Sequence, residues 1–170
     1  MIILNMAYPF EFIGISRDDA DEFQQDTLIY RFHSEKSGHR YEVHVERYVE
    51  HLSCVKFFDT TAMHGLGKYS QLSNTFEPRT IFRTITEVTL DALKRDPLSS
   101  FCFIGAADSR DDSSGVNTRR YRVYQTYVRN LDIDDLFESV FIDKHSLALL
   151  INRKAVDDFD SYVGRVLDFI

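Results

Sequence analysis

The alternation of apolar and polar positions divides the chain into segments with the period of strands and segments with the period of helices. Residues 41–48 alternate strictly, so one face of this segment is apolar and the other carries Glu42, His44 and Glu46. This pattern is typical of a strand with one buried and one wet face. With residues 28–32 and a glycine-containing turn between them, it predicts a β-hairpin. Further strands are predicted at residues 9–15, 54–58, 101–107, 137–141 and 147–152.

Three segments carry apolar residues at helical spacing. The first begins at Pro78, which suits a first helical turn, and ends before Pro97. The second follows Asn117 or Thr118, and the third follows Asp157 or Asp158, any of which can cap a helix. The predicted inward faces are Ile81, Ile85, Val88 and Ala92, then Tyr121, Tyr124, Val128 and Leu131, then Phe159, Tyr162, Val163, Val166 and Ile170.

The order of these elements predicts an α+β fold, with a twisted, mostly antiparallel central sheet of about six or seven strands and three main helices. The chain has 170 residues and no Pro- or Gly-rich linker, so we expect a single domain over residues 1–170. A long irregular stretch, residues 60–75, separates the fourth predicted strand from the first helix. Loops of this length often have a functional role.

Charge and cysteine content narrow the classes of function. Twenty Lys and Arg against 27 Asp and Glu give a formal charge of −7, which disfavours non-specific binding to nucleic acid or anionic membranes. No apolar run approaches the roughly 18 residues of a membrane helix, and no signal-peptide core is present, so we expect a soluble cytoplasmic protein. Cys54 and Cys102 lie in apolar segments and are expected to be buried and reduced. No motif predicts a metal site.

One local pattern carries a family resemblance. Asn117 opens the second predicted helix, and Tyr124 follows seven residues later within a basic, apolar stretch. Together with the element order over residues 28–152, this resembles the GNAT (Gcn5-related) acetyltransferases, and more loosely bacterial and phage proteins built on such a core. The resemblance implies acetyl-CoA as cofactor, with Asn117 in contact with it and Tyr124 protonating the departing thiolate. The same two residues are also explained as a helix cap and a core residue.

The resemblance implies further site residues. Ser73 and Asn74 lie ahead of the first helix, where the family binds the pyrophosphate of its cofactor. His44 or Glu46 would be the base that deprotonates an amine, although a histidine on a wet sheet face also fits a plain surface position. The family's phosphate loop is rich in glycine, whereas residues 71–78 contain none and end in Glu77 and Pro78. A carboxylate and a proline both disfavour an anion at this helix start.

We therefore expect a non-enzymatic binding or regulatory domain on a GNAT-like scaffold, without a cofactor, whose partner is a protein or a small ligand. Its site would lie among the loop at residues 60–75, the Asn117 end of the second helix and the strand of His44. The alternative is a divergent acyl-CoA-dependent N-acyltransferase that uses Tyr124, Asn117 and His44 or Glu46.

A basic cluster supports a second alternative, a nucleic-acid-binding accessory protein. Its members, with tyrosines interleaved, could bind phosphates and stack on bases. They could equally form a solvated face that pairs with the acidic segments 108–112 and 132–135, and the acidic total favours this interpretation. We therefore do not expect nucleic acid as a partner. The cluster consists of Arg119, Arg120, Arg122 and Arg129.

Overall fold

Seven strands form one sheet in the computed structural model, which describes residues 6–17, 21–61, 77–107 and 111–170. The strands are β1 (Phe10–Ser16), β2 (Gln24–His33), β3 (Arg40–Tyr48), β4 (Leu52–Asp59), β5 (Ser100–Ile104), β6 (Phe137–Ile142) and β7 (Leu147–Asn152). The helices are α1 (Pro78–Arg95), α2 (Arg119–Arg129) and α3 (Phe159–Phe169), with a short 3₁₀ turn at Asp143–His145.

The strands follow the order β1-β2-β3-β4-β5-β7-β6. Neighbouring strands are antiparallel except β4 and β5, which are parallel and are joined through α1. A parallel pair needs such a crossover connection, because the chain has to return to the same end of the sheet. The α+β class and the mostly antiparallel sheet with three helices are therefore confirmed, as is every predicted strand and helix.

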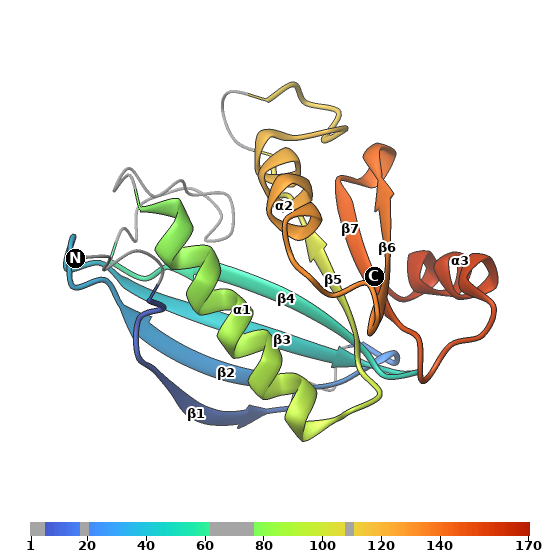
Figure 1. Ribbon diagram of the computed structural model, residues 1–170, viewed down its shortest axis with the longest axis horizontal. Coiled ribbons are helices and arrows are strands. Elements are labelled where there is room, and N and C mark those ends of the chain that lie inside the picture. The colour runs from blue at the N-terminus through green and yellow to red at the C-terminus, as the bar shows by residue number, and fades with distance from the viewer. Residues whose placement is uncertain (1–5, 18–20, 62–76, 108–110) are drawn as a thin grey trace.

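Helices cover both faces of the sheet (Figure 1). α1 and α2 lie on one face, where Val88 and Val128 pack in the same core as Phe101 of β5. α3 lies on the opposite face, where Tyr162 packs with Cys102. Successive residues of β5 thus enter different cores, which confirms the prediction of a central strand buried on both sides.

The helix starts follow the chemistry of their capping residues. Thr118, rather than Asn117, is the N-cap of α2, and Asp158 caps α3 by accepting a hydrogen bond from the backbone N–H of Ser161. Pro78 occupies the first turn of α1, as predicted. The prediction that Ile170 faces inward is wrong, because α3 ends before it and its side chain is 41% exposed.

β4 and β5 pair over only a short stretch and then separate. Their register joins Leu52, Ser53 and Cys54 to residues 100–102, yet β4 continues to Asp59. Figure 1 shows the two strands diverging, with α1 and α2 on either side of the divergence. Cys54 and Cys102 are opposite each other at the last position where β4 and β5 are in register. Both cysteines are buried and reduced, as predicted. A hydrogen bond with the Cys54 thiol, together with burial, raises the pKa of Cys102.

The start of α2 is held against the end of β5 at Gly105. A Cβ atom there would lie 2.6 Å from the Cβ of Tyr121 and 2.7 Å from Oγ1 of Thr118, with the backbone nitrogen of Tyr121 closer still. Thr118 Oγ1 also donates a 2.7 Å hydrogen bond to the carbonyl of Gly105. The absence of a side chain at this position therefore sets how closely α2 approaches the sheet.

We expect Gly105→Ala to lower the free energy of unfolding by about 1–3 kcal/mol, because backbone rather than a flexible side chain has to move. Denaturant unfolding followed by circular dichroism measures this. Gly164→Ala is the matched control, since a Cβ at Gly164 in α3 meets nothing within 4 Å. The control should be neutral or stabilise the protein by about 0.5–1 kcal/mol. Equal effects of the two substitutions would contradict the close-approach argument.

Candidate functional site

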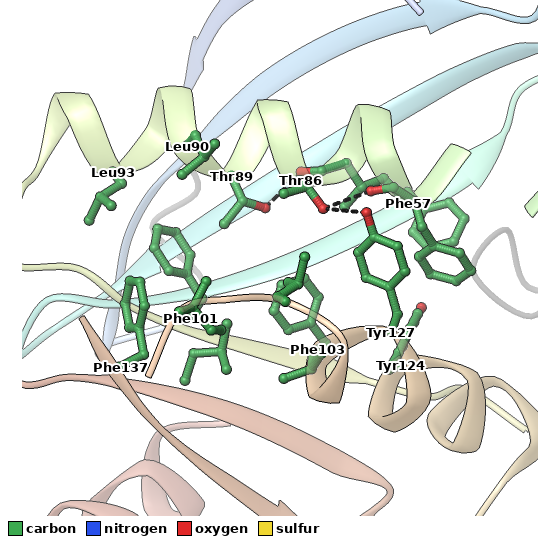
Figure 2. Close-up of a pocket in the computed structure, with 16 residues that line it drawn as sticks. Phe57, Thr86, Thr89, Leu90, Leu93, Phe101, Phe103, Tyr124, Tyr127 and Phe137 are labelled. Carbon is green, nitrogen blue, oxygen red and sulfur yellow. Dashed lines mark hydrogen bonds between the residues drawn. The ribbon is translucent and has the colours of Figure 1, made fainter. Parts of the chain in front are cut away.

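A cavity of about 70 Å³ lies between α1, α2 and the sheet, where β4 and β5 have separated (Figure 2). Aromatic and aliphatic side chains from β4, α1, β5 and α2 make up most of its wall. Leu90 lies on this wall and is also 42% exposed, which gives the cavity an apolar edge at the protein surface. The lining residues are Phe57, Phe82, Ile85, Thr86, Thr89, Leu90, Leu93, Phe101, Phe103, Tyr124, Tyr127, Val128, Leu131, Ile133, Phe137 and Leu150.

The polar atoms of α1 and Tyr127 in this wall already have partners. The hydroxyl groups of Thr86 and Thr89 donate to carbonyl oxygens one turn earlier in α1, at 2.9 and 2.8 Å. Thr86 Oγ1 also lies 3.1 Å from the hydroxyl of Tyr127. A water molecule in a cavity needs two to four polar partners, and a cavity whose polar groups bond elsewhere favours apolar occupants.

Tyr124 is buried in the wall of this cavity. Its ring makes edge or tilted contacts with Phe57, Phe82 and Phe103, with ring centroids 5.7–6.4 Å apart. Burial raises the pKa of Tyr124 to about 12, although the charge and hydrogen bond of Arg120 oppose the rise. The phenol is therefore protonated at neutral pH. The core-packing interpretation of this residue is confirmed, and its hydroxyl is a weak acid.

Asn117 precedes the helix cap in an unusual backbone conformation. Its φ is 50°, a left-handed value that asparagine tolerates better than most residues. Its N–H donates to the carbonyl of Asp143, and its own carbonyl accepts a 2.5 Å hydrogen bond from Arg122. The residue is exposed. Its local role is thus to turn the chain into α2.

His44 and Glu46 lie on the opposite face of the sheet from Tyr124. His44 pairs in register with Lys56, whereas the neighbouring Val45 and Val55 pack under α1. The sheet therefore separates the two predicted bases from the predicted acid. Each base is engaged where it lies: His44 Nε2 is 2.5 Å from Glu42 Oε1, and Glu46 forms a 2.7 Å ion pair with Lys56.

Ser73 and Asn74 lie outside the described residues. The segment that follows them ends in Glu77, the N-cap residue of α1, whose side chain makes no capping hydrogen bond. Instead, the carboxylate is buried and accepts hydrogen bonds from Tyr8 at 2.6 Å, Ser34 at 2.7 Å and Ser37 at 3.1 Å. Glu77 thus ties the start of α1 to the β2–β3 turn and to the N-terminal segment.

A second concavity lies beside the cavity, and we call it the arginine groove. It has a volume of about 670 Å³ and is lined by Pro78, Arg79, Phe82, Arg119, Arg122, Val123, Thr126, Tyr127 and Asn130. Among the described residues, no carboxylate forms an ion pair with the side chain of Arg79, Arg119 or Arg122. Arg119 and Arg122 belong to the basic cluster predicted from the sequence, whereas Arg79 does not, because only the fold brings α1 beside them.

The predicted basic cluster is divided by the fold. Arg119 and Arg122 line the groove, whereas Arg120 lies 5.6 Å from the Phe57 ring centroid and Arg129 lies 4.9 Å from that of Phe141. Asp111 accepts a hydrogen bond from the backbone N–H of Arg119, not from its side chain. Pairing of this cluster with segment 132–135 is not observed among the described residues.

Comparisons with known proteins give no relative whose site could be compared with this one. No family model, no curated protein and no solved structure matches this chain. Within the described ranges, no group of three or more His, Cys, Asp or Glu side chains could hold a metal ion. In that same part of the chain, no helix combines the length and apolarity needed to cross a bilayer.

Glu42, which bonds to His44 and Arg31, makes the stability of this face of the sheet depend on pH. Burial raises the pKa of Glu42, but hydrogen bonds and charge interactions with His44 and Arg31 outweigh it, so the pKa lies below the ordinary carboxyl value. This carboxylate therefore stabilises the fold above its unfolded pKa, and the contribution is lost as the pH falls through the lower folded value.

We expect Arg31→Gln to move the Glu42 pKa upward, measured by NMR titration of the side-chain carboxyl carbon.

The matched control for this titration is Arg165→Gln, which removes a cation that pairs with Glu50 instead. It should leave the Glu42 titration in place. A Glu42 midpoint unaffected by Arg31→Gln would show that Arg31 does not contribute to the depression of this pKa.

Proposed function

We propose that this protein is a non-enzymatic binding domain that holds the apolar part of a small ligand in the cavity between α1 and α2. The cavity itself carries the proposal. It lies where β4 and β5 separate, it has an apolar edge at Leu90, and the hydroxyl groups of Thr86 and Thr89 are bonded within α1. Ligand sites in proteins are commonly such concave, mostly apolar spaces with a few polar groups.

The distribution of acids and bases supports binding rather than catalysis. Among the described residues that line the cavity, the titratable side chains are Tyr124 and Tyr127. General acid–base catalysis needs a group that exchanges a proton near the working pH, within hydrogen-bond reach of the reacting atom. The pKa of Tyr124 is about 12, and His44 and Glu46 lie across the sheet. These positions support a site that holds a molecule without transforming it.

The element order supports a GNAT-like scaffold for this binding domain. An antiparallel run β1–β4, a helix, a central strand parallel to β4, a second helix and a closing strand pair succeed one another along the chain. The cavity falls at the divergence of the parallel pair. A fold of this kind suggests a location for a site, whereas the activity depends on the residues in it.

We expect Thr89→Leu to abolish binding of apolar probes while raising the melting temperature. The added methyl groups would fill the cavity, which stabilises a fold by about 0.5–2 kcal/mol. Xenon and benzene are suitable probes, the first followed by xenon NMR and the second by calorimetry. Thr126→Leu makes the same chemical change on the exposed face of α2 and should leave binding intact. Probe binding that survives in Thr89→Leu, or fails in the wild type, would contradict the proposal.

One observation favours a second candidate, an acyl-CoA-dependent N-acyltransferase: the protonated phenol of Tyr124 lines the cavity. The residues fit acyl-CoA in part. The apolar cavity would receive the acyl group, Tyr124 would donate a proton to the departing thiolate, and the exposed Asn117 would contact the cofactor. Among the described residues that line the cavity there is no base for this candidate, since His44 and Glu46 are on the other face of the sheet.

A turnover assay separates the two candidates. With acetyl-CoA and a panel of primary amines, we expect the wild-type protein to release no free CoA thiol, because no base among the described residues faces the cavity. Calorimetric titration with CoA and acetyl-CoA, run alongside, would report binding without turnover. Thiol release that disappears in Tyr124→Phe but persists in Tyr127→Phe, with both variants folded, would establish the acyltransferase and reject the binding-only proposal.

A further inference from the structure

The arginine groove combines three cations with two helix N-termini. Arg79 is the second residue of α1 and Arg119 is the first residue of α2, and neither helix has an acidic residue in its first turn. Helix N-termini carry a partial positive charge, so cations there are electrostatically unfavourable. Arg122 adds a third cation one turn along α2, where it donates to the carbonyl of Asn117.

Carboxylates lie at both helix starts, but among the described residues none forms an ion pair with the side chain of one of the three arginines. Asp111 accepts a hydrogen bond from the backbone N–H of Arg119. Glu77, the nearest carboxylate in sequence to Arg79, is bonded to Tyr8, Ser34 and Ser37. At other helix ends the charges are favourable, with cations at a C-terminus and an anion at an N-terminus. Lys94 and Arg95 lie at the C-terminal end of α1, and Asp160 lies in the first turn of α3. The protein as a whole has a charge of −7. The three guanidinium groups of the groove thus have no described carboxylate partner, and an anion bound among them would remove their mutual repulsion.

The organic part of the ligand is suggested by the wall that the groove shares with the cavity. Phe82 and Tyr127 line both spaces, and their rings are tilted by 30° with centroids 5.3 Å apart. Figure 2 shows the Tyr127 hydroxyl turned toward Thr86 of α1, on the cavity side. An anion held by the arginines therefore lies beside an aromatic surface that leads toward the apolar cavity.

We infer that the arginine groove binds the phosphate of a small phosphate monoester whose organic part packs on Phe82 and Tyr127. The inference deepens the proposed function and rests on it for the apolar part of the ligand. Guanidinium groups bind phosphate oxygens through paired, charge-assisted hydrogen bonds, and three of them suit a dianion. A small ester fits the observations better than a nucleic acid does, because a surface of charge −7 repels a long polyanion.

Calorimetry with phenyl phosphate tests the inference on the full chain at low salt. We expect Arg79→Gln and Arg122→Gln each to weaken binding about tenfold, because each removes a charge-assisted contact. Arg83→Gln is the matched control. Arg83 lies on α1 one turn beyond Arg79, outside the groove, and pairs with Glu87 at 3.8 Å. Its removal should change the affinity by less than about twofold.

A second readout separates an anion site from a merely structural role. Removing Arg79 should raise the melting temperature of the ligand-free protein by about 1–3 °C, because repulsion at the start of α1 is relieved. Arg122 is left out of this readout because its side chain also bonds to the carbonyl of Asn117. Loss of ligand affinity with gain of ligand-free stability is the expected combination for Arg79→Gln. Undiminished phenyl phosphate binding in both variants, equal loss in Arg83→Gln, or no binding to the wild type would overturn the inference.

Two further probes distinguish the possible failures. Tighter, steeply salt-dependent binding of single-stranded oligothymidylate, in competition with phenyl phosphate, would overturn the inference in favour of a nucleic-acid site. Xenon binding in the cavity should be unaffected by the arginine substitutions. If xenon fails to bind while the arginine-dependent phosphate binding persists, the proposed cavity function is rejected and the anion site remains. The reverse result rejects only the anion site.

Discussion

The short pairing of β4 with β5 is the constraint on which the rest of the site depends. The two strands are parallel, so the chain needs a crossover to connect them, and α1 provides it. They hydrogen-bond only as far as Cys54 and Cys102 and then separate. Beyond that point the sheet has no continuous surface for a helix to cover. α1 therefore packs on the β2–β4 side, α2 packs on the β5–β7 side, and aromatic side chains fill the space between them incompletely.

Gly105 sets how closely α2 approaches the end of β5 in this arrangement. It lies directly after β5 and allows the first turn of α2 to come within van der Waals contact of the strand. The Thr118 side chain completes the junction, because its single hydroxyl oxygen accepts from the helix and donates to Gly105. The position of α2, and with it that of Tyr124 and Tyr127, follows from a contact that no other residue type would permit at this distance.

Periodicity predicted the elements of this fold well, because each depends on local side-chain spacing. The alternation in β3 and the apolar stripe of α1 are visible without any structure, and the caps Thr118 and Asp158 fall among the predicted alternatives. The site was harder to predict from the sequence than the elements were. Alternation shows that His44 and Val45 face opposite ways, but it does not show which face α2 will cover. The sheet consequently came to lie between His44 and Tyr124.

The arginines illustrate the same limit. On a helix with about 100° between residues, Arg120 points well away from Arg122, so a dense basic run does not make a single basic face. Arg120 and Arg129 lie beside Phe57 and Phe141, and Arg119 and Arg122 line the groove. Arg79 joins them from a helix some forty residues earlier in the chain. Such a pairing depends on tertiary contacts that a single sequence does not report.

Two features of this protein depart from the usual rules of core packing and of charge at helix ends, and they lie next to each other. One is an unfilled apolar cavity, which costs stability because its lining loses dispersion contacts. The other is a set of cations at two helix N-termini without described carboxylate partners. Natural sequences tend to depart from local rules at functional sites and to follow them elsewhere. Here the cavity and the groove meet at Phe82 and Tyr127, and that convergence is the strongest physical reason to place the function at this junction of α1 and α2.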